Sequence, residues 1–124
     1  MERSLTVLLP VHDCQATLVD TVTQVLDAAS DLTDRFQLLI IDDGSSDATA
    51  EIADELARHY PQVRSMRHAK PLGREAALQT GLAHCRGDVA LLREGSRSTL
   101  ERLDTASQPV GPNYRRSRRS AGSD

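Results

Sequence analysis

The feature that most constrains the fold is a short apolar run that ends in two acidic residues. Leu38–Ile41 is followed directly by the pair Asp42–Asp43. Such a run is typical of a strand buried on both faces, as in a parallel sheet. Gly44 then permits a tight turn, and Ser46 or Asp47 can cap the helix that follows. Because ligands of open parallel sheets bind beyond the carboxyl ends of the strands, the two carboxylates are candidate binding groups.

Apolar runs and helical periodicities alternate along the rest of the chain. Strands are predicted at Leu5–Leu9 (closed by Pro10), Phe36–Ile41, Val63–Arg67 and Val89–Leu92. The segments between them have helical spacing of apolar residues, with Asp13 as a cap of the first helix and Pro71 opening the third. Leu100–Leu103 is predicted to begin a further short helix. Right-handed crossovers then give an α/β fold with three layers, a Rossmann-like half with a mostly parallel sheet of about four strands in the order 3-2-1-4.

Length and charge narrow the class of protein. The 124 residues suit one small domain, expected over residues 1–106, with a disordered Arg-rich tail over residues 107–124. The net charge of −3 gives no indication of nucleic-acid binding. Cys14 and Cys85 match no metal-binding spacing and are predicted to be reduced thiols partly buried in helices, which favours the cytoplasm. No signal peptide or membrane-spanning stretch is expected, and the absence of a Gly-x-Gly-x-x-Gly motif disfavours a dinucleotide-binding oxidoreductase.

Four motifs in order resemble the family 2 glycosyltransferases, which have the GT-A fold. Thr6–Asp13 resembles the opening Val-Ile-Pro-x-Tyr-Asn-Glu strand of that family, and Ile40–Thr49 is close to its Val-Asp-Asp-Gly-Ser-x-Asp-x-Thr motif. Gly73–Gly81 is similar to the family's Gly-Lys-x-x-Ala-Leu-Asn-x-Gly helix, and Ala83–Asp88 to its Ala-x-Gly-Asp. The resemblance runs from about residue 4 to about residue 96 and covers the N-terminal, nucleotide-binding half of the family fold.

The resemblance implies a binding site for the nucleotide of an activated sugar. Carried across position by position, the candidate nucleotide-binding residues are Pro10, His12, Asp13, Asp42, Asp43 and Arg74. One aspartate would accept a hydrogen bond from a base such as uracil, and the guanidinium of Arg74 suits a diphosphate. The alternatives remain open: a solvated turn with a helix cap for the aspartates, a surface residue for Arg74, and a loop residue without a ligand for His12.

The chain departs from the family where the family holds its metal. The family's Asp-x-Asp motif binds Mn²⁺ or Mg²⁺ against the diphosphate, and here its two positions are Glu94 and Ser96, with Arg93 beside them. A hard cation prefers several anionic oxygens, so Glu94 is the sole candidate ligand of a weakened site. The region that carries the family's acceptor site and general base is also expected to be missing, so no catalytic residue is assigned.

Three hypotheses follow. The chain is a truncated domain that binds a nucleotide or nucleotide sugar weakly and is not catalytic alone; it is an active transferase completed by a partner chain; or it is a Rossmann-like interaction module. A homodimer is expected because Val89–Leu92 would form an unprotected sheet edge, unless the segment around Leu100–Leu103 folds back over it. The tail, with four arginines within Arg115–Arg119, suggests either peripheral contact with the inner face of a membrane or a solvated solubilising segment.

Overall fold

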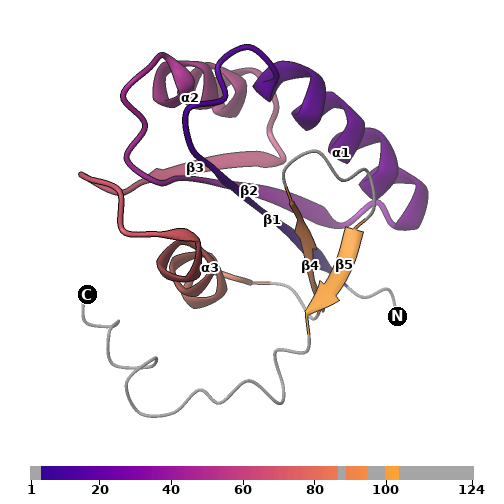
Figure 1. The fold of residues 1–124 in the computed structure, drawn as a ribbon. Helices are drawn as coiled ribbons and strands as arrows, with labels where there is room; N and C mark the ends of the chain where they lie inside the picture. The colour runs from indigo at the N-terminus through magenta and orange to yellow at the C-terminus, as the bar shows by residue number, and fades with distance from the viewer. Residues whose placement is uncertain (1–3, 87–88, 95–99, 104–124) are drawn as a thin grey trace.

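The computed structural model describes residues 4–86, 89–94 and 100–103. Within them one sheet has the strand order β3-β2-β1-β4-β5, with helices between the first four strands (Figure 1). The elements are β1 (Leu5–Val11), α1 (Leu18–Leu32), β2 (Phe36–Asp42), α2 (Thr49–His59), β3 (Val63–Arg67), α3 (Arg74–Ala83), β4 (Val89–Arg93) and β5 (Leu100–Leu103). The pairings β1–β2, β1–β4 and β2–β3 are parallel, which confirms the predicted order 3-2-1-4.

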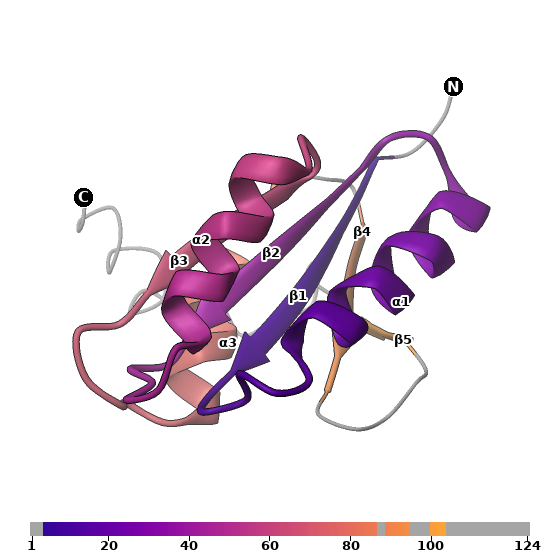
Figure 2. The same cartoon turned by 90° about the horizontal axis from the view of Figure 1, so that it is seen from above.

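The sheet is the middle of three layers. Helices α1 and α2 cover one face and α3 covers the other (Figures 1 and 2). Since side chains alternate along a strand, Val7 and Leu9 of β1 face α1 and α2, while Leu8 packs in the core beneath α3. Both faces of the central strands are therefore buried, as their mainly apolar sequences predict.

Strand β1 continues through Pro10, where the sequence predicted that it would end. The N–H of Leu5 donates to Arg35 O, and Val11 O accepts from the N–H of Asp43, so the odd-numbered residues of β1 bond to β2. Pro10 thus faces the β4 side, beyond the last paired residue, Leu8. A proline is tolerated there because no partner strand requires its missing N–H.

Leu100–Leu103 is a strand, so the prediction of a helix there is wrong. It pairs antiparallel with β4 in the register Ala90↔Leu103 to Arg93↔Leu100. Leu100 packs against the core on the α1 side and Leu103 against the core on the α3 side, which gives both leucines an apolar environment. Four residues are too few for their period to distinguish a strand from a helix. Because β5 covers β4, the predicted open edge does not exist, and the expectation of a homodimer through that edge loses its premise.

Two predicted helix starts are also wrong. Helix α1 begins at Leu18, so Asp13 does not cap it, and α3 begins at Arg74, three residues after Pro71. Asp13 instead has a left-handed φ of 47°, and its carboxylate accepts a hydrogen bond from the N–H of Ser46 in the next loop. A short polar residue tolerates this backbone conformation better than most. The Arg-rich tail of residues 107–124 lies outside the described residues.

Candidate functional site

The candidate residues converge at the carboxyl edge of the sheet. Pro10 and His12 come from the end of β1, and Asp42 and Asp43 from the end of β2. Arg74 is the first residue of α3, and Glu94 directly follows β4. This convergence follows from the parallel pairing, which places the ends of β1, β2 and β4 on one side of the sheet.

Side chains of the segment 42–49 connect the loops that follow β1 and β2 through hydrogen bonds. Ser45 Oγ accepts from the N–H of Asp13 at 2.8 Å, and Thr49 Oγ1 accepts from the N–H of Cys14 at 2.8 Å. Ser45 and Thr49 are both buried, and Ser46 donates its N–H to Asp13 Oδ1 at 2.8 Å. These contacts satisfy backbone groups that no helix or strand pairs. The hydroxyl positions of the motif therefore fix the shape of the edge.

Asp47 completes this connection at the start of α2. Its Oδ1 accepts from the hydroxyl and the N–H of Thr49, at 2.5 and 2.9 Å, and its Oδ2 accepts from the N–H of Gln15 at 3.3 Å. The hydrogen bond from the Thr49 hydroxyl is the main cause that lowers the pKa of Asp47. Asp47, rather than Ser46, thus satisfies a backbone donor at this helix start.

Asp43 is a buried carboxylate whose two oxygens are occupied by the protein itself. Its Oδ1 accepts from the N–H of Leu72 and from His68 Nδ1, at 2.9 and 2.8 Å, and its Oδ2 accepts from the N–H of Gly73 at 2.9 Å. Burial alone would raise the pKa of Asp43, but the donors from Leu72, His68 and Gly73 together lower it below its usual value. Asp43 thereby holds the segment that leads into Arg74.

Asp42 is equally enclosed. Its carboxylate is 1% exposed, its Oδ1 accepts a short hydrogen bond from the Ser45 hydroxyl, and its Oδ2 lies 3.6 Å from Arg67 Nε. The structure therefore brings Asp42 and Asp43 to the edge but engages both within the protein. Their direct contact with a nucleotide remains a prediction.

Gly44 allows the loop before α3 to lie directly on the turn after β2. Its φ is +64°, and a Cβ built at this position would lie 2.4 Å from Lys70 C and from Pro71 N. Only a residue without a side chain permits both this backbone conformation and this approach. The glycine of the motif is thus required for the packing of the two loops.

His12 and Asp13 form the accessible part of the β1 loop. The His12 ring donates from Nδ1 to the carbonyl oxygen of Asp43 at 2.8 Å, and its Nε2 lies 3.3 Å from Asp13 Oδ2. The two side chains are 46% and 41% exposed. Unlike the paired aspartates, these groups are open to a ligand.

Arg74 and Glu94 form an ion pair across the edge. The guanidinium Nη2 contacts Glu94 Oε2 in a short hydrogen bond, with Arg74 half-exposed and Glu94 more buried. Arg74, which was predicted to bind a diphosphate, and Glu94, which was predicted to bind a metal, therefore neutralise each other's charge. Ser96, the second position of the metal motif, lies outside the described residues.

The described side chains at this edge do not fit a divalent cation. No group of three or more His, Cys, Asp or Glu side chains that could hold a metal occurs within residues 4–86, 89–94 and 100–103. Glu94 is held by a guanidinium, and a second cationic side chain, Arg93, precedes it. Hard cations bind through several oxygen ligands, and one neutralised carboxylate does not supply them.

The sequence analysis did not identify His68 and Thr80, which form a hydrogen-bonded chain with Asp43. His68 follows β3, and its Nε2 lies 2.9 Å from the hydroxyl of Thr80 on α3, so the chain Asp43–His68–Thr80 links three elements. The His68 and Asp43 side chains are each only 10% exposed. The available sequence signal was the place of His68 at the carboxyl end of a predicted strand, whereas nothing local pointed to Thr80.

Both cysteines are free, but neither lies inside a helix as predicted. Cys14 precedes α1 and Cys85 follows α3, each partly buried. Burial raises the pKa of both thiols, to about 11 for Cys85. Since thiolates are the reactive form, neither environment is that of an activated nucleophile.

Among the helices that the structure describes, none is long and apolar enough to cross a bilayer.

Comparison with known proteins agrees with this geometry. The family model described as "Glycosyl transferase family 2" matches residues 6–92. The dolichyl-phosphate beta-glucosyltransferase ALG5C of Trichomonas vaginalis is 36% identical over 64 residues, which are 52% of this chain and 19% of the relative. The undecaprenyl-phosphate 4-deoxy-4-formamido-L-arabinose transferase of Salmonella choleraesuis is 28% identical over 90 residues, 72% of this chain and 28% of the relative. The chain thus spans between about a fifth and just over a quarter of these relatives.

Solved structures show the same fold at low identity. The mannosyltransferase PcManGT from Pyrobaculum calidifontis, in complex with GDP-Man and Mn²⁺, superposes with a TM-score of 0.68 at 18% identity, over 76% of this chain and 28% of that one. S. aureus TarS in complex with UDP gives a TM-score of 0.61 at 14% identity, over 73% of this chain and 27% of that one. These likenesses establish the N-terminal portion of a GT-A fold. With its family motifs assembled at one sheet edge and the family model matched from residue 6 to residue 92, the chain belongs to glycosyl transferase family 2.

Proposed function

We propose that the carboxyl edge of the sheet binds the nucleotide portion of a nucleotide sugar, and that the chain supplies the donor-binding part of a family 2 glycosyltransferase. The observation that carries this proposal is the role of Asp43. By accepting the N–H groups of Leu72 and Gly73, Asp43 fixes the start of α3 so that Arg74 stands at the edge, opposite Glu94. A buried, ionised carboxylate thereby positions an accessible guanidinium.

The exposed groups at the edge match the parts of a nucleoside diphosphate. Arg74 is the proposed partner of the diphosphate, because a guanidinium binds phosphate oxygens through parallel N–H donors. The diphosphate would compete with Glu94 for this cation. His12 and Asp13 are open to the nucleoside, where the carboxylate can accept from ribose hydroxyls or from a base N–H. Pro10 lies beside them near the end of β1, and Asp42 and Asp43 shape the loops.

Binding is expected to be weak, and transfer by this chain alone is expected to be absent. PcManGT is in complex with GDP-Man and Mn²⁺. In this chain Glu94 is paired with Arg74, and the described residues include no group of side chains that could hold such a metal. General base catalysis, worth about 10²–10⁴ in rate, also needs a positioned base at the acceptor. An active enzyme would then require completion by a partner chain or domain.

The relatives suggest the setting of the complete enzyme. Their names specify dolichyl phosphate and undecaprenyl phosphate, which are lipid-linked phosphates. We therefore propose a lipid phosphate as the acceptor class, and the cytoplasm, at the inner face of a membrane, as the location.

The experiment is a calorimetric titration of the full chain with UDP, GDP and a UDP-sugar, with and without Mn²⁺. We expect binding of at least one nucleotide, weakened about tenfold or more in Arg74→Ala because a charge-assisted hydrogen bond contributes about 1.5–3 kcal/mol. Arg58→Ala is the matched control, since Arg58 is an exposed arginine that pairs with Glu55 on α2, away from the edge. If no nucleotide binds to the folded chain, the proposal fails and an interaction module becomes the better interpretation.

A further inference from the structure

A cavity of about 510 Å³ lies between the end of β1, the start of α1 and the end of β4. It lies on the face of the sheet that α1 covers, whereas the Arg74–Glu94 pair stands at the start of α3 on the other face. Its volume falls within the range of small-molecule sites, about 300–1,000 Å³. Leu9, Val11 and Leu18 form apolar walls. The rest of the lining comes from the end of β1 and the loop before α1, from polar side chains of α1 and from β4: Pro10, His12, Cys14, Thr17, Asp20, Thr21, Gln24 and Arg93.

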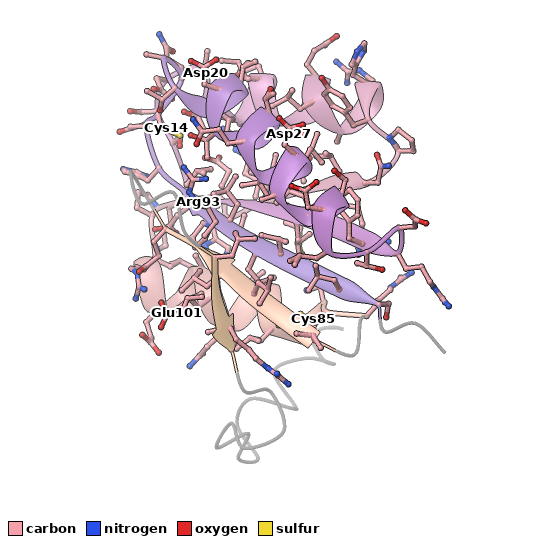
Figure 3. The ribbon with its side chains drawn as sticks, turned by 90° about the vertical axis from the view of Figure 1, so that its right-hand side faces the viewer. Cys14, Asp20, Asp27, Cys85, Arg93 and Glu101 are labelled. Atoms are coloured by element: carbon pink, nitrogen blue, oxygen red, sulfur yellow. The ribbon has the colours of Figure 1, made fainter. Side chains whose placement is uncertain are left out.

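Arg93 is the unusual member of this lining. Leu91, two residues earlier in β4, packs in the core on the α1 side, so the alternation of the strand directs Arg93 to the same face. Figure 3 shows Arg93 reaching from β4 toward the segment of Cys14 and the start of α1, with Asp20 on the same side. Arg93 is only 4% exposed, and its Nη2 donates to Gln24 Oε1 at 3.1 Å.

The charge of Arg93 has no counterpart in the described structure. Its Nε is buried without a hydrogen-bond partner, and no carboxylate among residues 4–86, 89–94 and 100–103 forms an ion pair with it. A buried charge is costly unless it is paired, and a neutral amide such as Gln24 compensates for only part of that cost. An apolar side chain would continue the pattern of β4 at this position without the cost.

We propose that this cavity binds an oxyanion, the carboxylate or phosphate group of a small molecule, with Arg93 as its charge partner. The hydroxyls of Thr17 and Thr21 and the amide of Gln24 also line the cavity and can contribute neutral hydrogen bonds. Asp20 adds one negative charge at the wall. Because Arg93 supplies a single positive charge, a group with one negative charge suits it better than a diphosphate does. Pro10 and His12, which belong to the proposed nucleotide edge, also line this cavity, so the two sites adjoin. Probes that carry no nucleoside, together with variants of Arg93, test the cavity separately from nucleotide binding.

The test uses the full chain at about pH 6 and constant ionic strength, with acetate, inorganic phosphate and geranyl phosphate as probes. We expect a saturable rise in melting temperature with at least one probe, and binding about tenfold or more weaker in Arg93→Leu. Arg102→Leu, which changes an exposed arginine on β5, is the matched control and should bind like the unmodified chain. A response to acetate and phosphate identifies a site for free anions; a response to geranyl phosphate alone identifies the phosphate of a larger apolar ligand.

Two results would overturn the proposal: none of the probes binds, or Arg93→Leu binds the probes as tightly as the unmodified chain. Phosphate can also raise the melting temperature of a protein without binding, because it is excluded from the protein surface. This general effect does not depend on Arg93, so it should be the same in Arg93→Leu and in Arg102→Leu. If Arg93→Leu does not fold, Arg93→Lys replaces it, since lysine keeps the charge but loses the planar guanidinium. Binding to Arg93→Lys should be several-fold weaker, and unchanged binding would contradict the assignment.

Discussion

Replacing Asp43 by asparagine tests whether this carboxylate holds the edge together. The substitution keeps the size of the side chain but removes its charge, and one of its two terminal atoms becomes a donor. In the structure, Oδ1 accepts from Leu72 N–H and His68, and Oδ2 accepts from Gly73 N–H. In Asp43→Asn the side-chain NH₂ would face the N–H of Gly73, so at least one partly buried donor loses its acceptor.

The magnitude follows from these contacts. An unsatisfied buried polar group costs about 1–3 kcal/mol, and the remaining donors to Oδ1 lose the added strength of a charged acceptor. We expect Asp43→Asn to lower the free energy of unfolding by about 2–4 kcal/mol, measured by urea denaturation. Asp54→Asn is the matched control because the Asp54 carboxylate accepts one exposed hydrogen bond, from Ser65. Its cost should be about 1 kcal/mol or less. A change below about 0.5 kcal/mol in Asp43→Asn would refute the reasoning.

The same carboxylate predicts a pH dependence with a definite sign. Its folded pKa is lowered from the ordinary value of 3.8, so the folded protein binds a proton less readily than the unfolded chain. The contribution of Asp43 is therefore fully present above the unfolded pKa and is lost as the pH falls through the lower, folded pKa. Below about pH 4, the difference in stability between the unmodified chain and Asp43→Asn should shrink.

Three further perturbations test neighbouring features. Gly44→Ala should destabilise the chain by about 2 kcal/mol or more, because the new Cβ meets the backbone at 2.4 Å; Gly73→Ala, with φ +105° but no atom within 4 Å, should cost less, and equal losses in urea denaturation would contradict this. Glu94→Gln should strengthen UDP binding several-fold in calorimetry by releasing Arg74, without any requirement for Mn²⁺; weaker binding, or a gain only with Mn²⁺, would argue against the proposed role of the pair. Cys85 should react slowly with iodoacetamide at pH 8 in the folded chain, since its pKa of about 11 leaves little thiolate, and alkylation as fast as in urea would show this environment to be wrong.

The sequence by itself determined the layered architecture. Short, mainly apolar runs identified β1, β2 and β4, because strands buried on both faces contain few polar residues. The alternation with helical periodicities fixed the parallel order 3-2-1-4, since right-handed crossovers leave few topologies. The Asp42–Asp43 motif was correctly placed at the carboxyl edge for the same reason. These are properties of local pattern and chain connectivity, which the sequence carries directly.

Only the tertiary structure decided what the residues at that edge contact. Whether Asp43 faces a ligand or accepts the N–H groups of Leu72 and Gly73 depends on how the loop before α3 folds back, across 29 and 30 residues of chain. The pairing of Arg74 with Glu94 spans 20 residues. The strand at Leu100–Leu103 likewise depends on the free edge of β4, because four residues have no preference strong enough to override a neighbouring unpaired strand. Partners of charged and polar side chains are set by such long-range approaches, which no local period encodes.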